Sequence, residues 1–213
     1  MAKKATEAVQ ITAPKFMTVS IPIYGTAPYV QLRFSQKAIQ AMKEKMEAGP
    51  TAKSRKTRTA RDFDDDFKQS QHRSEEGWCG IPASAFRNAI ISACRLVGFK
   101  MTLAKLSVFV KADGMDAVDG VPLIKINGKP EYLEMTVRNA TGVTDLRVRS
   151  KYWPWSATVN ITYDADQFTE TDIHNLFTRV GQQVGIGEGR PDSKSSAGTG
   201  WGTFTLEDPK KKK

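Results

Sequence analysis

Apolar residues recur every three or four positions in residues 77–98, and this spacing predicts a buried helix over residues 82–97. Its apolar positions are Phe86, Ala89, Ile90, Ala93, Cys94 and Val97. Pro82 suits the first turn of a helix, and Gly98 suits a left-handed cap at its C-terminal end. The opposite side carries Ser84, Arg87, Asn88, Ser92 and Arg95. We therefore expect one helix face in the core and a polar face with two arginines near solvent.

A second amphipathic pattern predicts a helix over residues 170–184. Thr169 is its expected N-cap, and Asp172 stands three positions later, where a capping box places an acidic residue. The apolar positions are Ile173, Leu176, Phe177, Val180 and Val184. Gly185 ends the pattern. A further helix is expected to begin at Ser35 and to end near Ala48.

Alternating apolar and polar residues predict strands in much of the remaining chain. The expected strands are residues 17–23, 29–34, 103–111, 155–163 and 201–206, with a hairpin inside residues 121–151 that turns near residues 139–142. The best-defined elements follow the order strand, helix, strand, strand, helix, strand. This βαββαβ order predicts the α+β class and a ferredoxin-like core with long insertions.

The length of 213 residues, 39% of them hydrophobic, suits one domain with insertions. We expect that domain over residues 15–207, with a disordered N-terminal tail (1–14) and a basic C-terminal tail (208–213). A flexible charged insertion is expected at residues 50–76 and a hairpin insertion at residues 115–152. The sequence has no run of about eighteen apolar residues and no apolar stretch after its first lysines, so we expect a cytoplasmic protein without a membrane partner.

Positive charge is concentrated in the first third of the chain. Residues 1–61 contain 12 lysines and arginines against 3 acidic residues, whereas residues 62–213 contain 20 of each. One basic cluster comprises Lys53, Arg55, Lys56, Arg58 and Arg61, and a second comprises Arg147, Arg149 and Lys151 on one side of a predicted strand. These clusters, together with Arg87 and Arg95 of the predicted helix, are the expected phosphate contacts. They favour a polyanionic partner, single-stranded RNA or DNA above all. A solubilising charged segment and an edge strand protected by charge are the alternatives.

Residues 185–200, GIGEGRPDSKSSAGTG, form a glycine-rich segment after the second predicted helix. Glycine lets backbone N–H groups approach a phosphate closely, and Arg190 and Lys194 add donors. The segment follows a helix and lacks a closing Gly-Lys-Ser/Thr, so it differs from dinucleotide-binding and P-loop motifs. A flexible connection between helix and strand is the alternative.

Two stretches together resemble the RAMP superfamily, the repeat-associated proteins of CRISPR effector complexes. Residues 81–89, IPASAFRNA, resemble the IPGSSL-(K/R)-G-type opening of the first helix in that family. Residues 185–204 resemble its glycine-rich loop, which typically ends G-x-G-x-F and here ends Gly200-Trp201-Gly202-Thr203-Phe204. Ala83 and Asn88 depart from the family pattern, and the loop is longer and more polar than usual.

The resemblance implies a modified RNA-recognition-like fold in a backbone subunit that polymerises along a guide RNA and grips its phosphates. It also implies that the helix opening and the loop lie close together and face RNA, through Ser84, Arg87, Gly187, Gly189, Gly198 and Gly200. The long insertions would correspond to thumb-like elements that separate bases and contact the next subunit. The expected assembly is a homo-oligomer or a multi-subunit ribonucleoprotein.

Catalytic patterns are sparse in this sequence. No Ser/His/Asp, Cys/His or zinc-binding spacing is present. The acidic run of Asp62, Asp64, Asp65 and Asp66 is the best candidate, because clustered carboxylates can hold magnesium for phosphodiester cleavage. The same run also fits a disordered acidic segment that competes with nucleic acid for the preceding arginines. We therefore expect a non-enzymatic binder without cofactor or metal. A metal-dependent endoribonuclease and an assembly protein that keeps the fold are the alternatives.

Overall fold

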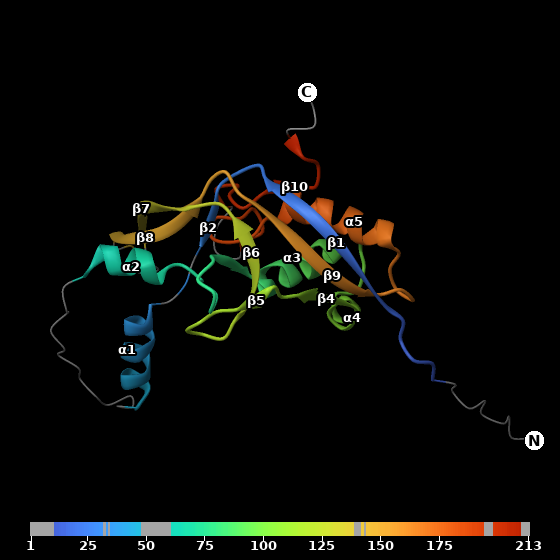
Figure 1. Cartoon of the computed structure of the whole chain (residues 1–213), viewed down its shortest axis with the longest axis horizontal. Coiled ribbons are helices and arrows are strands. Elements are labelled where there is room, and N and C mark those ends of the chain that lie inside the picture. Colours follow the sequence, from blue (N-terminus) through green and yellow to red (C-terminus); the bar gives the residue numbers. More distant parts are fainter. Residues whose placement is uncertain are drawn as a thin grey trace, which may run out of the picture.

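The computed structural model describes residues 11–31, 33, 35–47, 61–138, 142, 144–193 and 198–209. The protein is a mixed α+β structure with antiparallel sheets (Figure 1). Its elements are β1 (Phe16–Gly25), β2 (Tyr29–Gln31), α1 (Gln36–Glu47), α2 (Phe63–Gln69), β3 (Gly80–Pro82), α3 (Ala83–Leu96), α4 (Met101–Ser107), β4 (Val108–Lys111), β5 (Gly114–Met115), β6 (Pro122–Asn127), β7 (Pro130–Arg138), β8 (Thr144–Tyr152), β9 (Ser156–Asp164), α5 (Glu170–Arg179), the π-helical turn η1 (Val180–Val184) and β10 (Phe204–Thr205).

The larger sheet is built around β1 and β9, which pair antiparallel along their length from Phe16 opposite Asp164 to Tyr24 opposite Ser156. β10 pairs with the end of β1. On the other side of β9, β4 pairs with one part of the strand and β6 with another. β6 in turn pairs with β3 and β5.

Helices α3 and α5 cover one face of this sheet, and β1 and β9 pass in front of them in Figure 1. Alternate residues of the two strands, among them Ile21 and Val159, are buried on that face. Phe86 of α3 contacts Phe177 of α5 with ring centroids 6.0 Å apart, and Phe177 contacts Phe204 of β10 at 5.3 Å. The main core therefore lies between the sheet and these two helices.

A second sheet of three strands has the order β2-β8-β7. Tyr29 of β2 joins it to the main core, because its ring lies 5.8 Å from both Tyr152 and Trp155. Helix α2 packs on this sheet, where the hydroxyl oxygens of Ser70 and Ser150 are 2.6 Å apart.

The two main helix predictions are confirmed to within one or two residues. α3 begins at Ala83 after Pro82, and Gly98 adopts the predicted left-handed conformation with φ of 72°. In α5 the Thr169 hydroxyl accepts a hydrogen bond from the Asp172 N–H, and the Asp172 carboxylate accepts one from the Thr169 N–H. The last part of the predicted helix, residues 180–184, is the π-helical turn η1.

Two strand predictions were partly wrong. Residues 101–107 form helix α4, and only residues 108–111 form a strand. Packing against α3 overrides the local alternation, because the helix buries the small residues Ala104 and Ser107 and leaves Leu106 71% exposed. The last strand is confined to residues 204–205, because the N–H of Trp201 bonds to Gly189 and that of Gly202 bonds to Pro28.

The structure describes residues 61–76 of the charged insertion that is expected at residues 50–76. Helix α2 forms there, and four polar residues beside it are buried: Ser70, Gln71, His72 and Ser74. These residues are buried because hydrogen-bond partners surround them, a compensation that composition does not reveal. Residues 50–60 lie outside the described part, as do residues 139–141 of the predicted hairpin turn. Among the residues described, no helix is both long and apolar enough to span a bilayer.

Candidate functional site

A cleft of about 520 Å³ brings together α3, β8 and the glycine-rich loop that follows η1. We call it the α3–loop cleft. Its lining residues are Tyr29, Gln31, Pro82, Ser84, Ala85, Asn88, Ala89, Ser92, Arg147, Val184, Ile186, Gly187, Glu188, Gly189, Arg190, Asp192 and Ser193. They come from segments that lie far apart in the sequence.

One wall of the cleft is a polar stripe of α3. Ser84, Asn88 and Ser92 are four residues apart and therefore lie on one side of the helix. The helix begins after Pro82, whose side chain accepts no hydrogen bond, so the N-cap residue offers no side-chain acceptor to the N–H groups of the first turn. These groups and the helix dipole place partial positive charge at this end of the cleft.

The opposite wall is the glycine-rich loop, and its own backbone hydrogen bonds hold it in place. The N–H of Ile186 bonds to the Gly202 carbonyl at 3.0 Å, and the N–H of Glu188 bonds to the Val30 carbonyl at 2.9 Å. Gly187 has φ of 79°, and a Cβ added to it would lie 2.5 Å from the Val30 carbonyl oxygen, so a larger residue does not fit.

Three backbone N–H groups of this loop, those of Gly187, Gly189 and Arg190, have no acceptor among the residues that the structure describes. All three residues line the cleft. A phosphate group suits such donors, because its oxygens accept several N–H groups at once.

Arg147 and Arg190 supply the positive charge of the cleft. Arg190 donates to the Gly187 carbonyl at 3.1 Å, and Arg147 lies at the outer limit of an ion pair with Asp145, at 3.5 Å. The two acidic residues of the lining are neutralised by arginines. Glu188 pairs with Arg149 at 2.5 Å, and Asp192 pairs with Arg95 at 3.0 Å.

The carboxylate of Asp192 stays ionised in this arrangement. A hydrogen bond from Ser92, together with Arg95, holds its pKa below the ordinary value although burial acts in the opposite direction. Because Asp192 and Glu188 each have an arginine partner, the unbalanced charge that faces the cleft is positive.

Five residues predicted to bind nucleic acid meet in this cleft: Ser84, Arg147, Gly187, Gly189 and Arg190. The predicted closeness of the helix opening and the glycine-rich loop is thus a feature of the structure. Gly198 and Gly200 belong to the same loop but do not line the cleft. Whether any of these residues binds nucleic acid stays a prediction.

The two outward arginines of α3 have different surroundings from those expected. Arg87 does not line the cleft: its guanidinium donates to the carbonyls of Val108 and Lys105 at 3.1 and 2.5 Å. It also lies 5.0 Å from the centre of the Phe109 ring. Arg95 lies beside the cleft as the partner of Asp192.

Several predicted phosphate contacts already have acidic partners. Arg61 pairs with Asp66 at 3.3 Å and with Asp145 at 3.1 Å, and Lys151 pairs with Glu131 at 2.7 Å. Such pairs reduce the charge that these side chains can offer to a phosphate. Lys53, Arg55, Lys56, Arg58 and Lys194 lie outside the described residues.

The acidic run has a structural explanation in helix α2. The Asp62 carboxylate caps the helix by accepting the N–H groups of Asp64 and Asp65 at 3.1 and 3.0 Å. The run is thus helical and not disordered, because Asp62 caps a helix that includes the other three aspartates. Asp66 pairs with one of the preceding arginines, Arg61. In the ranges that the structure describes, these carboxylates do not gather closely enough for three of them to share an ion.

One cluster within those ranges has the spacing of metal ligands: His72, Asp116 and Asp119. The guanidinium of Arg33 already supplies a cation there, 3.4 Å from Asp116 and 2.7 Å from Asp119. The side chains of Arg33 and Asp116 are only 8% and 0% exposed. We therefore interpret the cluster as a buried ion-pair network and not as a metal centre.

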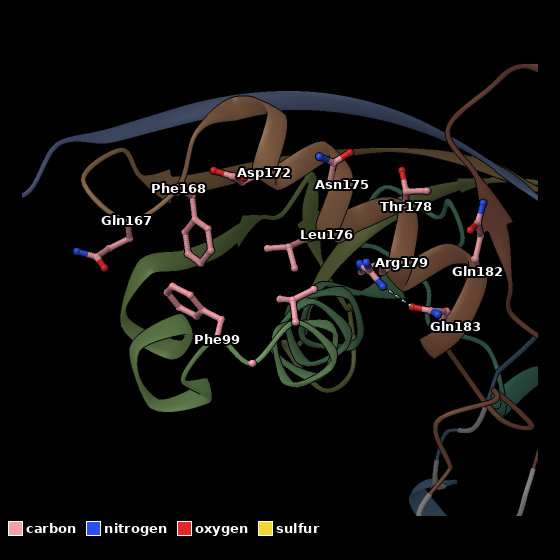
Figure 2. Close-up of a pocket in the computed structure, with 12 residues that line it drawn as sticks. Phe99, Gln167, Phe168, Asp172, Asn175, Leu176, Thr178, Arg179, Gln182 and Gln183 are labelled. Atoms are coloured by element: carbon pink, nitrogen blue, oxygen red, sulfur yellow. Dashed lines mark hydrogen bonds between the residues drawn. The ribbon is translucent and has the colours of Figure 1, made fainter.

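Figure 2 shows a larger hollow of about 790 Å³ between α5 and the turn after α3. Phe99 and Phe168 pack together there, with ring centroids 4.7 Å apart. Its charged groups have partners within the chain, because Asp172 belongs to the capping box and Arg179 donates to Gln183. The hollow thus offers apolar and amide surface, and the α3–loop cleft is the better candidate for an ionic ligand.

The chain matches no protein-family model and no curated protein.

Sequence reasoning had not assigned four cleft residues to the site: Asn88, Ser92, Tyr29 and Gln31. The first two were detectable, because they follow Ser84 at helical spacing on the polar side of α3. Tyr29 and Gln31 carry no such signal. They reach the cleft because β2 lies beside the glycine-rich loop, where the Val30 carbonyl accepts the N–H of Glu188.

Proposed function

We propose that this protein binds single-stranded nucleic acid, RNA in particular, and grips its phosphates in the α3–loop cleft. One observation carries the proposal: a helix opening, an arginine of β8 and a glycine-rich loop converge on one positively charged cleft. The donors match the ligand, because phosphate oxygens accept backbone N–H groups, hydroxyls and guanidinium groups together. A phosphate is thus the chemical group that satisfies most of them at once.

A single strand fits this site better than a duplex does. The volume of about 520 Å³ lies within the range of ~300–1,000 Å³ that is common for small-ligand pockets. A duplex presents a stiff outer backbone, whereas a single strand can bend one nucleotide into a concave site. The polar stripe of Ser84, Asn88 and Ser92 can then hydrogen-bond to the sugar or the base.

We further propose a ferredoxin-like fold of the RAMP type. β1 and β4 both pair antiparallel with β9, which lies between them, so they run in the same direction. α3 connects β1 to β4 on the face that α5 also covers, which supports a split βαβ arrangement. The closeness of the α3 opening to the glycine-rich loop supports the family resemblance.

The remaining parts of the proposal concern assembly and chemistry. We propose a subunit of a homo-oligomer or a multi-subunit ribonucleoprotein, without catalytic activity of its own. The capped and paired carboxylates of α2 give no specific reason to prefer the endoribonuclease alternative.

The test measures fluorescence anisotropy of labelled oligouridine with wild-type protein and with the double variant Arg147→Gln/Arg190→Gln. Removal of two charge-assisted hydrogen bonds should weaken binding by about tenfold or more. It should also reduce the slope of log K against log salt by about 0.7 for each phosphate that the variant no longer neutralises. Arg179→Gln on α5 is the matched control, because Arg179 lies outside the cleft and donates only to Gln183 among the described residues.

Two results would contradict the proposal. Wild-type protein that binds neither oligouridine nor oligothymidine at low salt excludes a general single-strand binder. If Arg179→Gln, which removes one charge, costs half as much binding free energy as the cleft variant, which removes two, only overall charge matters and the cleft is not the site.

A further inference from the structure

The face of the larger sheet that turns away from α3 and α5 carries two exposed aromatic rings. Phe16 of β1 is 46% exposed and Phe109 of β4 is 39% exposed. Their ring centroids are 5.8 Å apart, with the ring planes at 70°. β1 and β9 form much of this face, and in Figure 1 no helix lies in front of them. We call this surface the open sheet face.

Hydroxyl and amide groups fill the open sheet face between and beside the rings. The hydroxyls of Thr18 and Thr162 form a hydrogen bond of 2.9 Å across β1 and β9. Asn160 of β9 stands opposite Lys111 of β4 in the strand register. Such groups can donate to, and accept from, the edges of nucleobases and ribose hydroxyls.

Two lysines at the margin of this face add positive charge to it. Lys111 of β4 and Lys125 of β6 are exposed, and neither forms an ion pair with any residue in the ranges described. This contrasts with Arg149 of β8, whose guanidinium is paired with Glu188. Lysines with free charge beside exposed aromatic rings complement a polyanion that carries flat bases.

Arg87 connects to this surface from the edge of the sheet. Its guanidinium is held by the carbonyls of Val108 and Lys105 and lies over the Phe109 ring at 5.0 Å. Arg87, Phe109 and Phe16 thus form a row of flat groups that runs from the edge strand to β1. Stacking on such a row suits bases of any sequence, because every base has a π-face.

The composition of the face argues against a protein partner. A stable protein interface needs a continuous apolar centre, but the centre here is made of threonine, serine and asparagine side chains on β1 and β9. Besides the two phenylalanines, strand alternation places Pro22 and Tyr24 of β1 on this face, at the other end of its polar centre. The face therefore matches a ligand that alternates flat rings with hydrophilic groups.

We propose that the open sheet face is a base-stacking surface for single-stranded nucleic acid, separate from the phosphate-gripping α3–loop cleft. The proposal rests on the proposed function, since it assigns the bases of the same class of ligand to a second surface. Under this proposal Arg87, which does not line the cleft, takes part in binding through its contact with Phe109.

The decisive experiment compares two probes of equal charge: oligouridine of ~12 nucleotides, and an abasic ribose-phosphate oligomer of the same length. Stacking adds affinity only for the first probe, so wild-type protein should bind oligouridine at least about fivefold more tightly. Phe16→Ala/Phe109→Ala should reduce this ratio to about one. The cleft variant Arg147→Gln/Arg190→Gln should weaken binding of both probes and keep the ratio.

Leu106→Ala on α4 is the control for removal of an exposed apolar side chain, and it should leave the ratio unchanged. Thermal unfolding shows whether the double phenylalanine variant is folded. A second measurement needs no variant: photocrosslinking of 5-iodouridine oligomers to wild-type protein should label peptides that contain Phe16 or Phe109.

The outcomes separate the two proposals. If a folded phenylalanine variant keeps the wild-type ratio, or if crosslinks form only in cleft peptides, the open sheet face is not a binding surface and the cleft proposal stands. If wild-type protein binds neither probe, both proposals are overturned. If the phenylalanine variant changes self-association but not the probe ratio, the face is a protein interface and the stacking proposal is overturned.

Discussion

His72 is the residue whose environment differs most from its place in a charged, polar stretch of sequence. Its ring nitrogen Nδ1 lies 2.9 Å from Asp116, which also contacts Arg33. Burial would raise the pKa of Asp116, but the N–H groups of Asp119 and Val118, together with His72 and Arg33, hold it below the ordinary value. This network connects residue 33, the segment after α2 and the turn before β6. It therefore holds these three segments together.

The pH dependence of stability should reveal this network. Burial lowers the pKa of His72 below its ordinary value of 6.5, although Asp116 opposes the shift. The folded protein therefore holds His72 neutral while the unfolded chain takes up a proton. The neutral, buried His72 therefore contributes to the free energy of unfolding above pH 6.5. This contribution is lost as the pH falls toward the pKa of His72 in the folded state.

We expect the urea midpoint of wild-type protein to fall between about pH 7 and pH 5, and to fall less in His72→Asn. The asparagine amide can keep the hydrogen bond to Asp116 without titrating. The chain has 2 histidines, so His174→Asn serves as the control for the replacement of a histidine elsewhere. Identical pH profiles for His72→Asn and wild-type protein would show that His72 does not control this dependence.

At the scale of elements, the run from α5 through η1 to the glycine-rich loop shapes the functional cleft. α5 begins with a capping box, and η1 ends at Gly185 with φ of 69°. The π-helical turn then places Val184 in the cleft lining, and Ile186 follows it there. Small changes at either end of this run should therefore alter both stability and the cleft.

Thr169→Ala should lower the free energy of unfolding by about 1 kcal/mol, because it removes the acceptor for the Asp172 N–H. Chemical denaturation checks this value. Thr171→Ala, at an exposed position in the first turn of the same helix, is the control and should change stability by less than about 0.5 kcal/mol. A Thr169→Ala variant as stable as this control would mean that the capping box contributes little.

For the whole molecule, charge is distributed so that most of the described arginines have partners within the chain. The net charge of +9 arises in residues 1–61. The densest group of positive residues lies in the sequence between α1 and α2 and comprises Lys53, Arg55, Lys56 and Arg58. Long-range attraction of a polyanion depends on this unbalanced charge. Specific grip depends on the cleft.

Replacing Lys53, Arg55, Lys56 and Arg58 with serine should reduce the slope of log K against log salt for oligouridine by up to about 3, since each neutralised phosphate contributes ~0.7. Anisotropy titrations at several salt concentrations measure the slope. Serine at residues 210–213 is a matched control, because it removes four lysines from the end of the chain. A change of equal size in both variants would assign the effect to net charge alone.

The sequence by itself determined the elements whose signals are local. α3 and α5 follow from the spacing of Phe86, Phe177 and their neighbours and from residues that begin or end a helix, such as Thr169 and Gly98. β1 and β9 follow from strict alternation on a half-buried face. Ser84 and the loop glycines of the candidate site were detectable for the same reason, because each occupies a recognisable position in a local pattern.

Only the tertiary structure decided the features that depend on partners distant in the chain. α4 forms where alternation favoured a strand, because the helix packs against α3 and buries Ala104. His72 is buried because Asp116 and Arg33 reach it. Arg147 faces the cleft while Arg149, two residues later, is bound to Glu188 of the loop. Local spacing in the sequence decides on which face of an element a side chain lies. The energy of a buried charge depends instead on the group beside it, and that group comes from a distant part of the chain and is brought there by folding.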